Sequence, residues 1–326
     1  MIISKTPLRI SFVGGGSDMQ DFYTRVPGAV VSTTVDKYIY ITINKRFDES
    51  IRVGYSQTET VERVDDIQHA LVREALRLTG LEKGLEITSI ADIPSKGTGL
   101  GSSSTFTVGL LKALYAYKGE EVSANRLAEE ASKIEIDILG EPIGKQDQYA
   151  SAFGGFNFIR FNSDHSVAVE PIALSAETKA MLQKNILILY TGLTRNASDI
   201  LKKQKENITS DEKKIEILSK MTQLAHKLRD VLQSSRLDSF GQILHENWLL
   251  KKQLTDSIST TNIDRWYDTA LQNGAEGGKL LGAGGGGFML FYAPSEKHQA
   301  IINALPELQP VTFSFESEGS TIIFVH

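Results

Sequence analysis

The stretch SKGTGLGSSST at residues 95–105 constrains the fold of this chain more than any other part of the sequence. It contains three glycines and four serines, and the apolar-periodic run FTVGLLKALYAYKG follows it directly. A flexible linker between two domains is one explanation. However, a strand-like segment, LEITSI at 85–90, precedes the stretch, so it joins neighbouring elements of one domain. This position favours a loop that wraps a ligand.

The residue types of this loop suit an anion. Gly97, Gly99 and Gly101 allow positive φ angles, which bring successive backbone N–H groups toward one point. The serines supply a helix N-cap and hydroxyl ligands, and the helix dipole adds positive potential. A tight glycine turn with a serine cap accounts for the same residues. Glycine content alone does not decide between a phosphate cradle and such a turn.

The composition indicates a globular protein. The chain has 326 residues, 41% hydrophobic residues and a net charge of −5, which argues against a nucleic-acid surface. It contains no cysteine, which excludes disulfides and thiolate metal sites and suits a reducing compartment. The N-terminal residues have no signal-peptide pattern, and no run of about 20 apolar residues predicts a membrane helix. We expect a cytoplasmic protein without nucleic-acid or membrane partners.

Strands and helices alternate along the chain. The patterns predict strands at 8–13, 38–44 and 85–90, helices at 66–79 and 124–139, and a hairpin over 154–174. A buried-type strand at 185–192 is followed by long helices to about residue 273, and strands return at 287–293, 311–316 and 320–326. We place a domain boundary near residue 180, although no linker composition marks it.

Four motifs together resemble those of the GHMP kinases, a superfamily that includes galactokinase, homoserine kinase and mevalonate kinase. PSKGTGLGSSS at 94–104 resembles the loop that wraps the ATP phosphates in that family. TPLRISFVGGGSD at 6–18 is similar to the motif that lines the sugar site, and LLGAGGGGF at 280–288 to the C-terminal glycine-rich motif. GEPIGKQDQ at 140–148 resembles the galactokinase-type motif that carries the catalytic aspartate. The motifs follow the family's order.

The resemblance implies an α+β fold with the active site between two domains. An N-terminal α/β domain (1–180) would bind ATP and sugar, and a ferredoxin-like domain (181–326) would follow. The expected cofactors are ATP and Mg²⁺. The residues matched to ATP binding are Lys96, Gly97, Thr98, Gly99, Leu100, Gly101, Ser102, Ser103 and Ser104.

The resemblance also assigns catalytic and metal-binding residues. Asp147 corresponds to the general base, although a lone aspartate at this position is more often a helix N-cap. Arg9 corresponds to the arginine that faces the transferring phosphoryl group. Glu135 matches the magnesium-binding glutamate, and Ser103 is the expected second ligand, with Ser104 close behind.

The substrate site is expected to contain Gly15, Gly16, Ser17, Asp18, Thr191, Arg195, Gly284 and Gly285. Galactokinases have a Glu-His pair where this chain has Gly15 and Gly16, so galactose is disfavoured. The GGGSD variant resembles the heptose-phosphate kinase branch, and YTGLTRNASDIL at 190–201 resembles a segment of the same branch. That segment suits a second phosphate, with Arg195 as partner. A helix-start loop with a surface arginine explains it equally well.

The resemblance therefore predicts a sugar kinase. It would transfer the γ-phosphate of ATP to the C1 hydroxyl of D-glycero-D-manno-heptose 7-phosphate, giving the 1,7-bisphosphate for nucleotide-activated heptose synthesis. A fucokinase-like C1 kinase and a catalytically silent ligand-binding protein are the alternatives. The presence of Arg9, Ser103, Glu135 and Asp147 favours an enzyme. The only expected partner is a small-molecule sugar phosphate, and the sequence allows a homo-oligomer.

Overall fold

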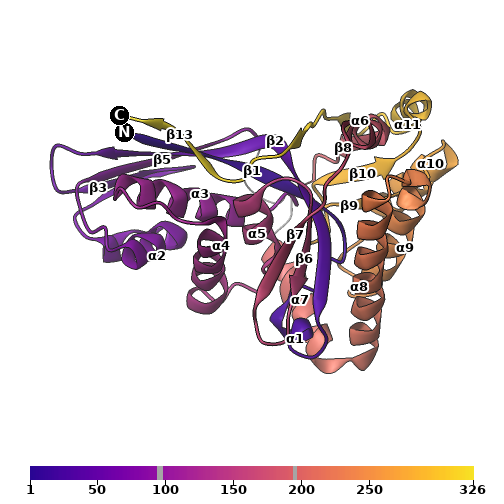
Figure 1. Ribbon diagram of the computed structural model, residues 1–326, viewed down its shortest axis with the longest axis horizontal. Helices are drawn as coiled ribbons and strands as arrows, with labels where there is room; N and C mark the ends of the chain where they lie inside the picture. Colours follow the sequence, from indigo (N-terminus) through magenta and orange to yellow (C-terminus); the bar gives the residue numbers. More distant parts are fainter. Residues whose placement is uncertain (94–97, 194–196) are drawn as a thin grey trace.

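A long antiparallel pair, β1 (Ile2–Val13) and β2 (Gly28–Lys45), forms the centre of the larger of two sheets (Figure 1). The computed structural model describes residues 1–93, 98–193 and 197–326. The outer end of β1 alternates between buried and half-buried residues, whereas residues 6–13 are buried throughout. The inner end of β1 is therefore covered on both faces, and it leads into the candidate site.

The larger sheet has the order β13-β1-β2-β5-β3-β4, with β6 and β12 also paired to β2 and β7 paired to β6. The remaining strands are β3 (Ile51–Gly54), β4 (Thr58–Val61), β5 (Leu85–Ala91), β6 (Asn157–Phe161), β7 (Val167–Pro171), β12 (Phe315–Glu316) and β13 (Thr321–Val325). All pairs are antiparallel except β3 with β5.

Helices of the first half cover one face of this sheet (Figure 1). They are α2 (Ala70–Thr79), α3 (Ser102–Tyr117), α4 (Ala124–Ser132) and α5 (Gln146–Phe153), with a 3₁₀ turn at Val64–Asp66 and a π-helical segment at Lys133–Ile138. The short helix α1 (Gln20–Tyr23) lies beside α7 (Ala197–Ser210) instead (Figure 1). Of the covering helices, α3 packs directly on β1 and β2. This packing brings the N-terminus of α3 to the buried end of β1.

The second half contains a four-stranded antiparallel sheet of order β11-β8-β10-β9. Its elements are α6 (Ala176–Asn185), β8 (Ile186–Tyr190), α7 (Ala197–Ser210), α8 (Glu212–Gln233), α9 (Phe240–Lys252), α10 (Thr261–Gln272), β9 (Gly277–Leu280), β10 (Phe288–Tyr292), α11 (His298–Ala304) and β11 (Gln309–Pro310), with 3₁₀ turns at Leu237–Ser239 and Ser295–Lys297. The expected α+β architecture is confirmed.

The two halves share a core. One apolar cluster joins the larger sheet to residues of α8 and α9, and a second surrounds the smaller sheet. A buried lysine also crosses between them, because Lys279 on β9 donates to the backbone oxygens of Ser11 and Phe12 at 2.7 and 2.9 Å. The predicted boundary near residue 180 stays a prediction, and β12 and β13 return to the first sheet.

Several predicted elements have different bounds. The helix expected over 66–79 begins at Ala70, because Val64–Asp66 forms a separate turn and Ile67 is extended. The helix expected over 124–139 becomes π-helical after Ser132. Of the segment 311–316, only Phe315–Glu316 is a strand. None of the helices in the described residues is both long and apolar enough to cross a membrane.

The contact between α3 and β1 depends on a glycine. A Cβ atom added to Gly109 would lie 2.6 Å from Oγ1 of Thr6, and the Gly109 oxygen accepts a 2.8 Å bond from Ser4 Oγ. The helix therefore approaches the strand more closely than a side chain permits. This approach sets the position of the helix N-terminus relative to Arg9 on β1.

We predict that Gly109→Val lowers the free energy of unfolding by about 2 kcal/mol, as overpacking of a close interface does. Denaturant or thermal unfolding measures the change. Lys112→Ala, on a half-exposed position of the same helix, serves as the control and should change little. A Gly109→Val protein as stable as this control would contradict the close-packing argument.

Candidate active site

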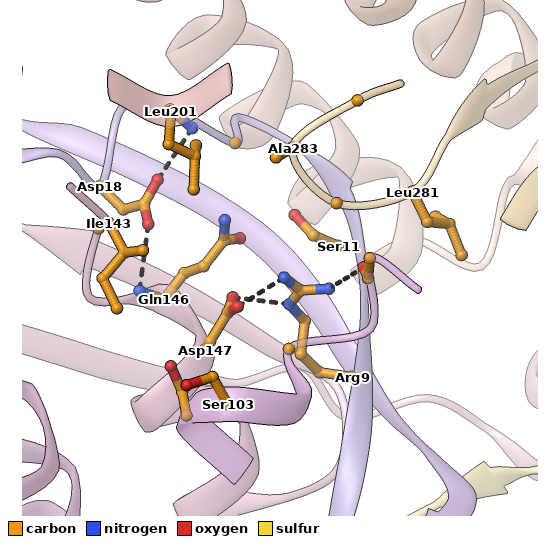
Figure 2. A pocket seen from close by; sticks show the side chains of 18 of the residues that line it. Arg9, Ser11, Asp18, Ser103, Ile143, Gln146, Asp147, Leu201, Leu281 and Ala283 are labelled. Atoms are coloured by element: carbon orange, nitrogen blue, oxygen red, sulfur yellow. Dashed lines mark hydrogen bonds and ion pairs between the residues drawn. The ribbon is translucent and has the colours of Figure 1, made fainter. Parts of the chain in front are cut away.

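A cavity of about 660 Å³ lies where the two halves meet. It is lined by the inner end of β1 and the loop after it, the loop before α3, the first turns of α3 and α5, α7, α9, and the loop after β9 (Figure 2). The predicted site residues that line it are Arg9, Gly15, Gly16, Asp18, Thr98, Gly99, Gly101, Ser102, Ser103, Ser104, Glu135, Asp147 and Gly284.

The glycine loop before α3 has the conformation that the sequence predicts. Gly99 and Gly101 have φ angles of +79° and +77°. The expectation that a serine caps α3 is wrong, because Gly101 itself is the N-cap residue and makes no side-chain cap. The serine cluster forms the first helical turn instead. Its three serines line the cavity, where Ser103 Oγ bonds to Glu135 and Ser102 Oγ to Thr98.

A second glycine loop closes against the first. A Cβ atom on Gly99 would lie 2.4 Å from the backbone oxygen of Leu281, and one on Gly282 would lie 2.2 Å from Cα of Gly99. These backbones touch with no room for a side chain. The described part of the first loop, from Thr98, and the motif at 280–288 are far apart in sequence, and they therefore form one continuous wall of the cavity.

Arg9 and Asp147 form a two-pronged ion pair at the floor of the cavity (Figure 2). The Nε and Nη2 groups of Arg9 each donate a 2.7 Å bond to a different oxygen of Asp147, and Nη1 donates to the Gly99 oxygen at 2.6 Å. Arg9 is 4% exposed, whereas the Asp147 side chain is 22% exposed. The carboxylate therefore keeps open lone pairs toward the cavity.

Glu135 lies buried beside the serine cluster. One oxygen accepts a 3.0 Å bond from Ser103 Oγ, and the other accepts a 2.6 Å bond from Gln148 Nε2. Burial raises the pKa of Glu135 to about 7, against the hydrogen bonds that lower it, and the nearby charge of Asp147 raises it further. A nearby positive charge stabilises the ionised form of such a buried carboxylate, so this position favours a cation.

Asp18 holds the opposite side of the cavity. Its carboxylate accepts backbone bonds from Gly16 at 2.9 Å and from Gln146 at 3.2 Å (Figure 2). Burial raises the pKa of Asp18, and the charge of Asp147 adds to this effect. Gly144 touches Asp18 so closely that an added Cβ atom would lie 2.0 Å from Oδ2. The motifs at 6–18 and 140–148 are thus joined at this carboxylate.

Some predicted site residues have other surroundings. Leu100 is buried in the core, and Ser17 exchanges bonds with the backbone of Ala29. The Thr191 hydroxyl donates to the Gly287 oxygen at 2.8 Å, and Gly285 donates its N–H to the Ile258 oxygen. None of these four predicted residues lines the cavity. Lys96, Gly97 and Arg195 lie outside the described residues.

Sequence reasoning missed two buried lysines near the site. Lys251 on α9 lines the cavity and donates to the Gly282 oxygen; burial and the charge of Arg9 lower its pKa to about 8. Lys279 also lines the cavity, and burial lowers its pKa well below the usual value. The position of Lys279 within the apolar segment GGKLLG is the one feature of the sequence that could have indicated a buried lysine. Such a pattern does not distinguish a buried lysine from an exposed one.

Comparison with known proteins identifies the family. Residues 66–155 match the GHMP kinases N terminal domain, and residues 228–310 match the GHMP kinases C terminal family. The chain belongs to the GHMP kinases. It is an ATP-dependent phosphotransferase with an alcohol group as acceptor, so the prediction of a kinase is confirmed.

Individual relatives cover nearly the whole chain. The chain is 33% identical to the D-glycero-alpha-D-manno-heptose 7-phosphate kinase of Campylobacter jejuni, over 98% of this chain and 97% of that protein. It is 28% identical to the bifunctional fucokinase/GDP-fucose pyrophosphorylase of Arabidopsis thaliana, over 92% of this chain but 31% of that protein. A crystal structure of a D-glycero-D-manno-heptose 1-phosphate kinase from Bacteroides thetaiotaomicron superposes with a TM-score of 0.83 at 26% identity, and covers 100% of both chains.

Two glycines with the same φ angle allow a matched test of the loop before α3. Gly101 and Gly119 both have φ of +77°, so alanine at either position introduces similar backbone strain. At Gly101 the new Cβ atom would lie 3.1 Å from Asp147 Oδ2 and 3.3 Å from Arg9 Cγ, whereas at Gly119 it would meet nothing within 4 Å.

We therefore expect Gly101→Ala and Gly119→Ala to lose similar stability, about 1 kcal/mol. Only Gly101→Ala should lower kcat/KM, by about tenfold or more, because it displaces the ion pair. Steady-state kinetics and thermal unfolding of both variants measure this. Equal kinetic losses in the two variants would mean that backbone strain, not contact with the ion pair, explains the effect.

Proposed function

We propose that this kinase transfers the γ-phosphate of ATP to the C1 hydroxyl of D-glycero-D-manno-heptose 7-phosphate. The product would be the 1,7-bisphosphate, which supplies nucleotide-activated heptose synthesis. The observation that carries the proposal is the position of the Asp147 carboxylate, which faces the cavity between the glycine loop before α3 and the sugar-side residue Asp18. The heptose acceptor is supported by the names of two of the relatives that match nearly the full chain.

In this reaction Asp147 accepts the proton of the attacking hydroxyl. The hydroxyl oxygen forms a bond to the γ-phosphorus, the bond from that phosphorus to the β-phosphate oxygen breaks, and ADP leaves. Arg9 holds both carboxylate oxygens in one orientation, so the base needs no reorganisation as the proton moves. Its fixed positive charge also faces the phosphoryl group, where charge develops in the transition state.

The glycine loop before α3 would hold the phosphates of ATP. Its backbone N–H groups and the first turn of α3 offer donors to phosphate oxygens, and the helix dipole favours negative charge there. The Thr98 and Ser102 hydroxyl groups, 3.4 Å apart, lie on the same side of the cavity. The contact with the second glycine loop fixes the wall against which the nucleotide would rest.

The residues beside this loop fit Mg²⁺. Ser103 Oγ and Glu135 Oε1 lie 3.0 Å apart, the spacing of roughly 3 Å that neighbouring ligands have in an octahedral Mg²⁺ shell. Within the described ranges no group of three or more Asp, Glu or His side chains forms a metal cage. Such a pair of ligands is typical of Mg²⁺ bound jointly by protein and phosphate. When bound, the ion neutralises phosphate charge.

The distal phosphate of the substrate requires a separate anion site. The segment 190–201 stays our candidate, with Arg195 as the predicted partner. Asp18 and the loop around Gly15 and Gly16 would instead contact the sugar itself. A fucokinase-like kinase would share Asp147 and Arg9 but would need no second anion site.

Product analysis tests the proposal. With ATP and heptose 7-phosphate, ³¹P NMR should show a new anomeric phosphate. Asp147→Asn should lower kcat by about 10²-fold or more, because general-base catalysis is lost, while ATP affinity measured by calorimetry persists. Phosphorylation of fucose but not of heptose 7-phosphate would contradict the heptose assignment. Near-normal turnover by Asp147→Asn would contradict the role of Asp147.

We also propose that Lys251 contributes positive charge to the phosphate side of the cavity. Lys251 is 5% exposed. Among the described residues, its ammonium group donates one hydrogen bond, to the Gly282 oxygen. The charged groups that act on it are Arg9 on β1, Asp18 after β1, and Asp147 on α5; Lys279 on β9 lies near it too. Its pKa of about 8 lies far enough below that of a free lysine for the charge to titrate near neutrality.

The ammonium is present below this pKa and is lost as the pH rises through it. We therefore expect kcat/KM for ATP to fall as the pH rises through about 8. In Lys251→Met, kcat/KM for ATP should be lower than in the wild type at every pH, and it should not decline as the pH rises. Lys252→Met is the control, because Lys252 pairs with Asp264 at 2.9 Å outside the cavity. An unchanged alkaline decline in Lys251→Met would assign the titration to another group.

A further inference from the structure

Gly15 and Gly16 line the sugar side of the cavity, near Asp18, and contribute no side chains to it. A Cβ atom added to Gly15 would lie 3.6 Å from Gln146 Nε2 and 3.7 Å from Ser11 Oγ. A Cβ atom added to Gly16, where φ is +106°, would lie 2.4 Å from Gln204 Nε2. The space for a side chain at Gly16 is thus already occupied by Gln204, whereas Gln146 and Ser11 lie at ordinary contact distance from Gly15.

These side chains come from both halves of the protein. Ser11 lies on β1 and Gln146 begins α5, whereas Gln204 lies on α7 of the second half. Figure 2 shows the Gln146 amide directed into the pocket and Leu201 of α7 above it. Gln204 is three residues after Leu201, so both residues lie on one face of α7, and both line the cavity.

All three side chains carry a buried polar atom without a partner among the described residues. The atoms are Ser11 Oγ, Gln146 Oε1 and Gln204 Nε2. Gln204 is 2% exposed and Ser11 4%, so bulk water does not satisfy them. A buried donor or acceptor that stays unsatisfied costs about 1–3 kcal/mol. Three such atoms around one cavity indicate a ligand that completes their hydrogen bonds.

The mixture of donors and acceptors identifies the chemistry of this ligand. The Gln204 amide N–H groups need an acceptor, the Gln146 carbonyl needs a donor, and a serine hydroxyl serves either role. A phosphate dianion only accepts, and the neighbouring carboxylate of Asp18 repels it. Adjacent sugar hydroxyl groups both donate and accept. The site therefore suits a diol of the acceptor sugar rather than its phosphate.

We propose that Gln204, with Gln146 and Ser11, binds the hydroxyl groups of the acceptor and that Gln204 is a specificity-determining residue of this kinase. Gly16 permits this arrangement because any side chain there displaces the Gln204 amide. The inference rests on the proposed function in taking a sugar as acceptor, but it does not require a heptose.

Gln204→Met tests the proposal, since methionine retains the length of the side chain but removes the donor. In this variant the KM for heptose 7-phosphate should rise about tenfold, the effect of one lost hydrogen bond. The KM for ATP should stay unchanged. Gln299→Met, at an exposed position of α11, is the matched control. Equal acceptor KM values in Gln204→Met and the control would overturn the proposal, as would an equal rise in KM for ATP.

Deoxy analogues distinguish a contact from a structural effect. The 2-, 3- and 4-deoxy analogues of the acceptor are compared in the wild type and in Gln204→Met. One analogue should bind the wild type about tenfold more weakly than the parent sugar, whereas Gln204→Met should not distinguish the two. If Gln204→Met weakens every analogue to the same degree, the residue does not contact a hydroxyl group.

The steric argument has its own test. Gly16→Ala should raise the acceptor KM as Gln204→Met does, and the double variant should be no worse than the poorer single variant. Additive losses would overturn the link between the two positions.

If the wild type does not phosphorylate heptose 7-phosphate, the heptose assignment fails. The same comparisons are then made with the sugar that it phosphorylates fastest, and they decide the role of Gln204 independently.

Discussion

The guanidinium of Arg9 is the interaction on which the rest of the site depends. Arg9 is almost fully buried, and its guanidinium binds Asp147 at the start of α5 and the Gly99 oxygen in the loop before α3. The backbone N–H of Arg9 donates to the Leu100 oxygen. A buried charge that loses its partner costs several kcal/mol, so these three elements cannot separate independently. The phosphate-side loop and the carboxylate are therefore positioned by one residue of β1.

Local motifs explain why much of this site could be predicted from the sequence. Arg9, Asp147 and the loop glycines each lie in a short segment, and the residue types and spacing within that segment are enough to recognise the motif. Gln204, Lys251 and Lys279 lie in ordinary helix and strand patterns, and they reach the cavity only through tertiary packing. Lys279 bonds to the backbone of Ser11, which is 268 residues away. No local pattern reports such a contact, and the fold class is therefore easier to predict than the full cavity wall.

The cap of α3 and the position of Glu135 show where local propensity misleads. Serine is the commoner N-cap residue, but Gly101 takes the left-handed conformation that this turn requires, and the serines enter the helix. The pattern over 124–139 fits one α-helix. The chain instead widens into a π-helical segment, in which the Leu139 N–H donates to the Ile134 oxygen. Glu135 lies within this wider turn, and a periodicity of 3.6 residues does not reveal it.

The pairing of β13 with β1 has a consequence for protein synthesis. Ile2 is opposite Val325, so β1 obtains its neighbour on this side only after the chain through β13 has been made. At about 5–20 residues per second, β1 waits roughly 15 to 65 s for this partner. During that time one edge of the larger sheet presents unpaired backbone groups, which are a template for association with other chains.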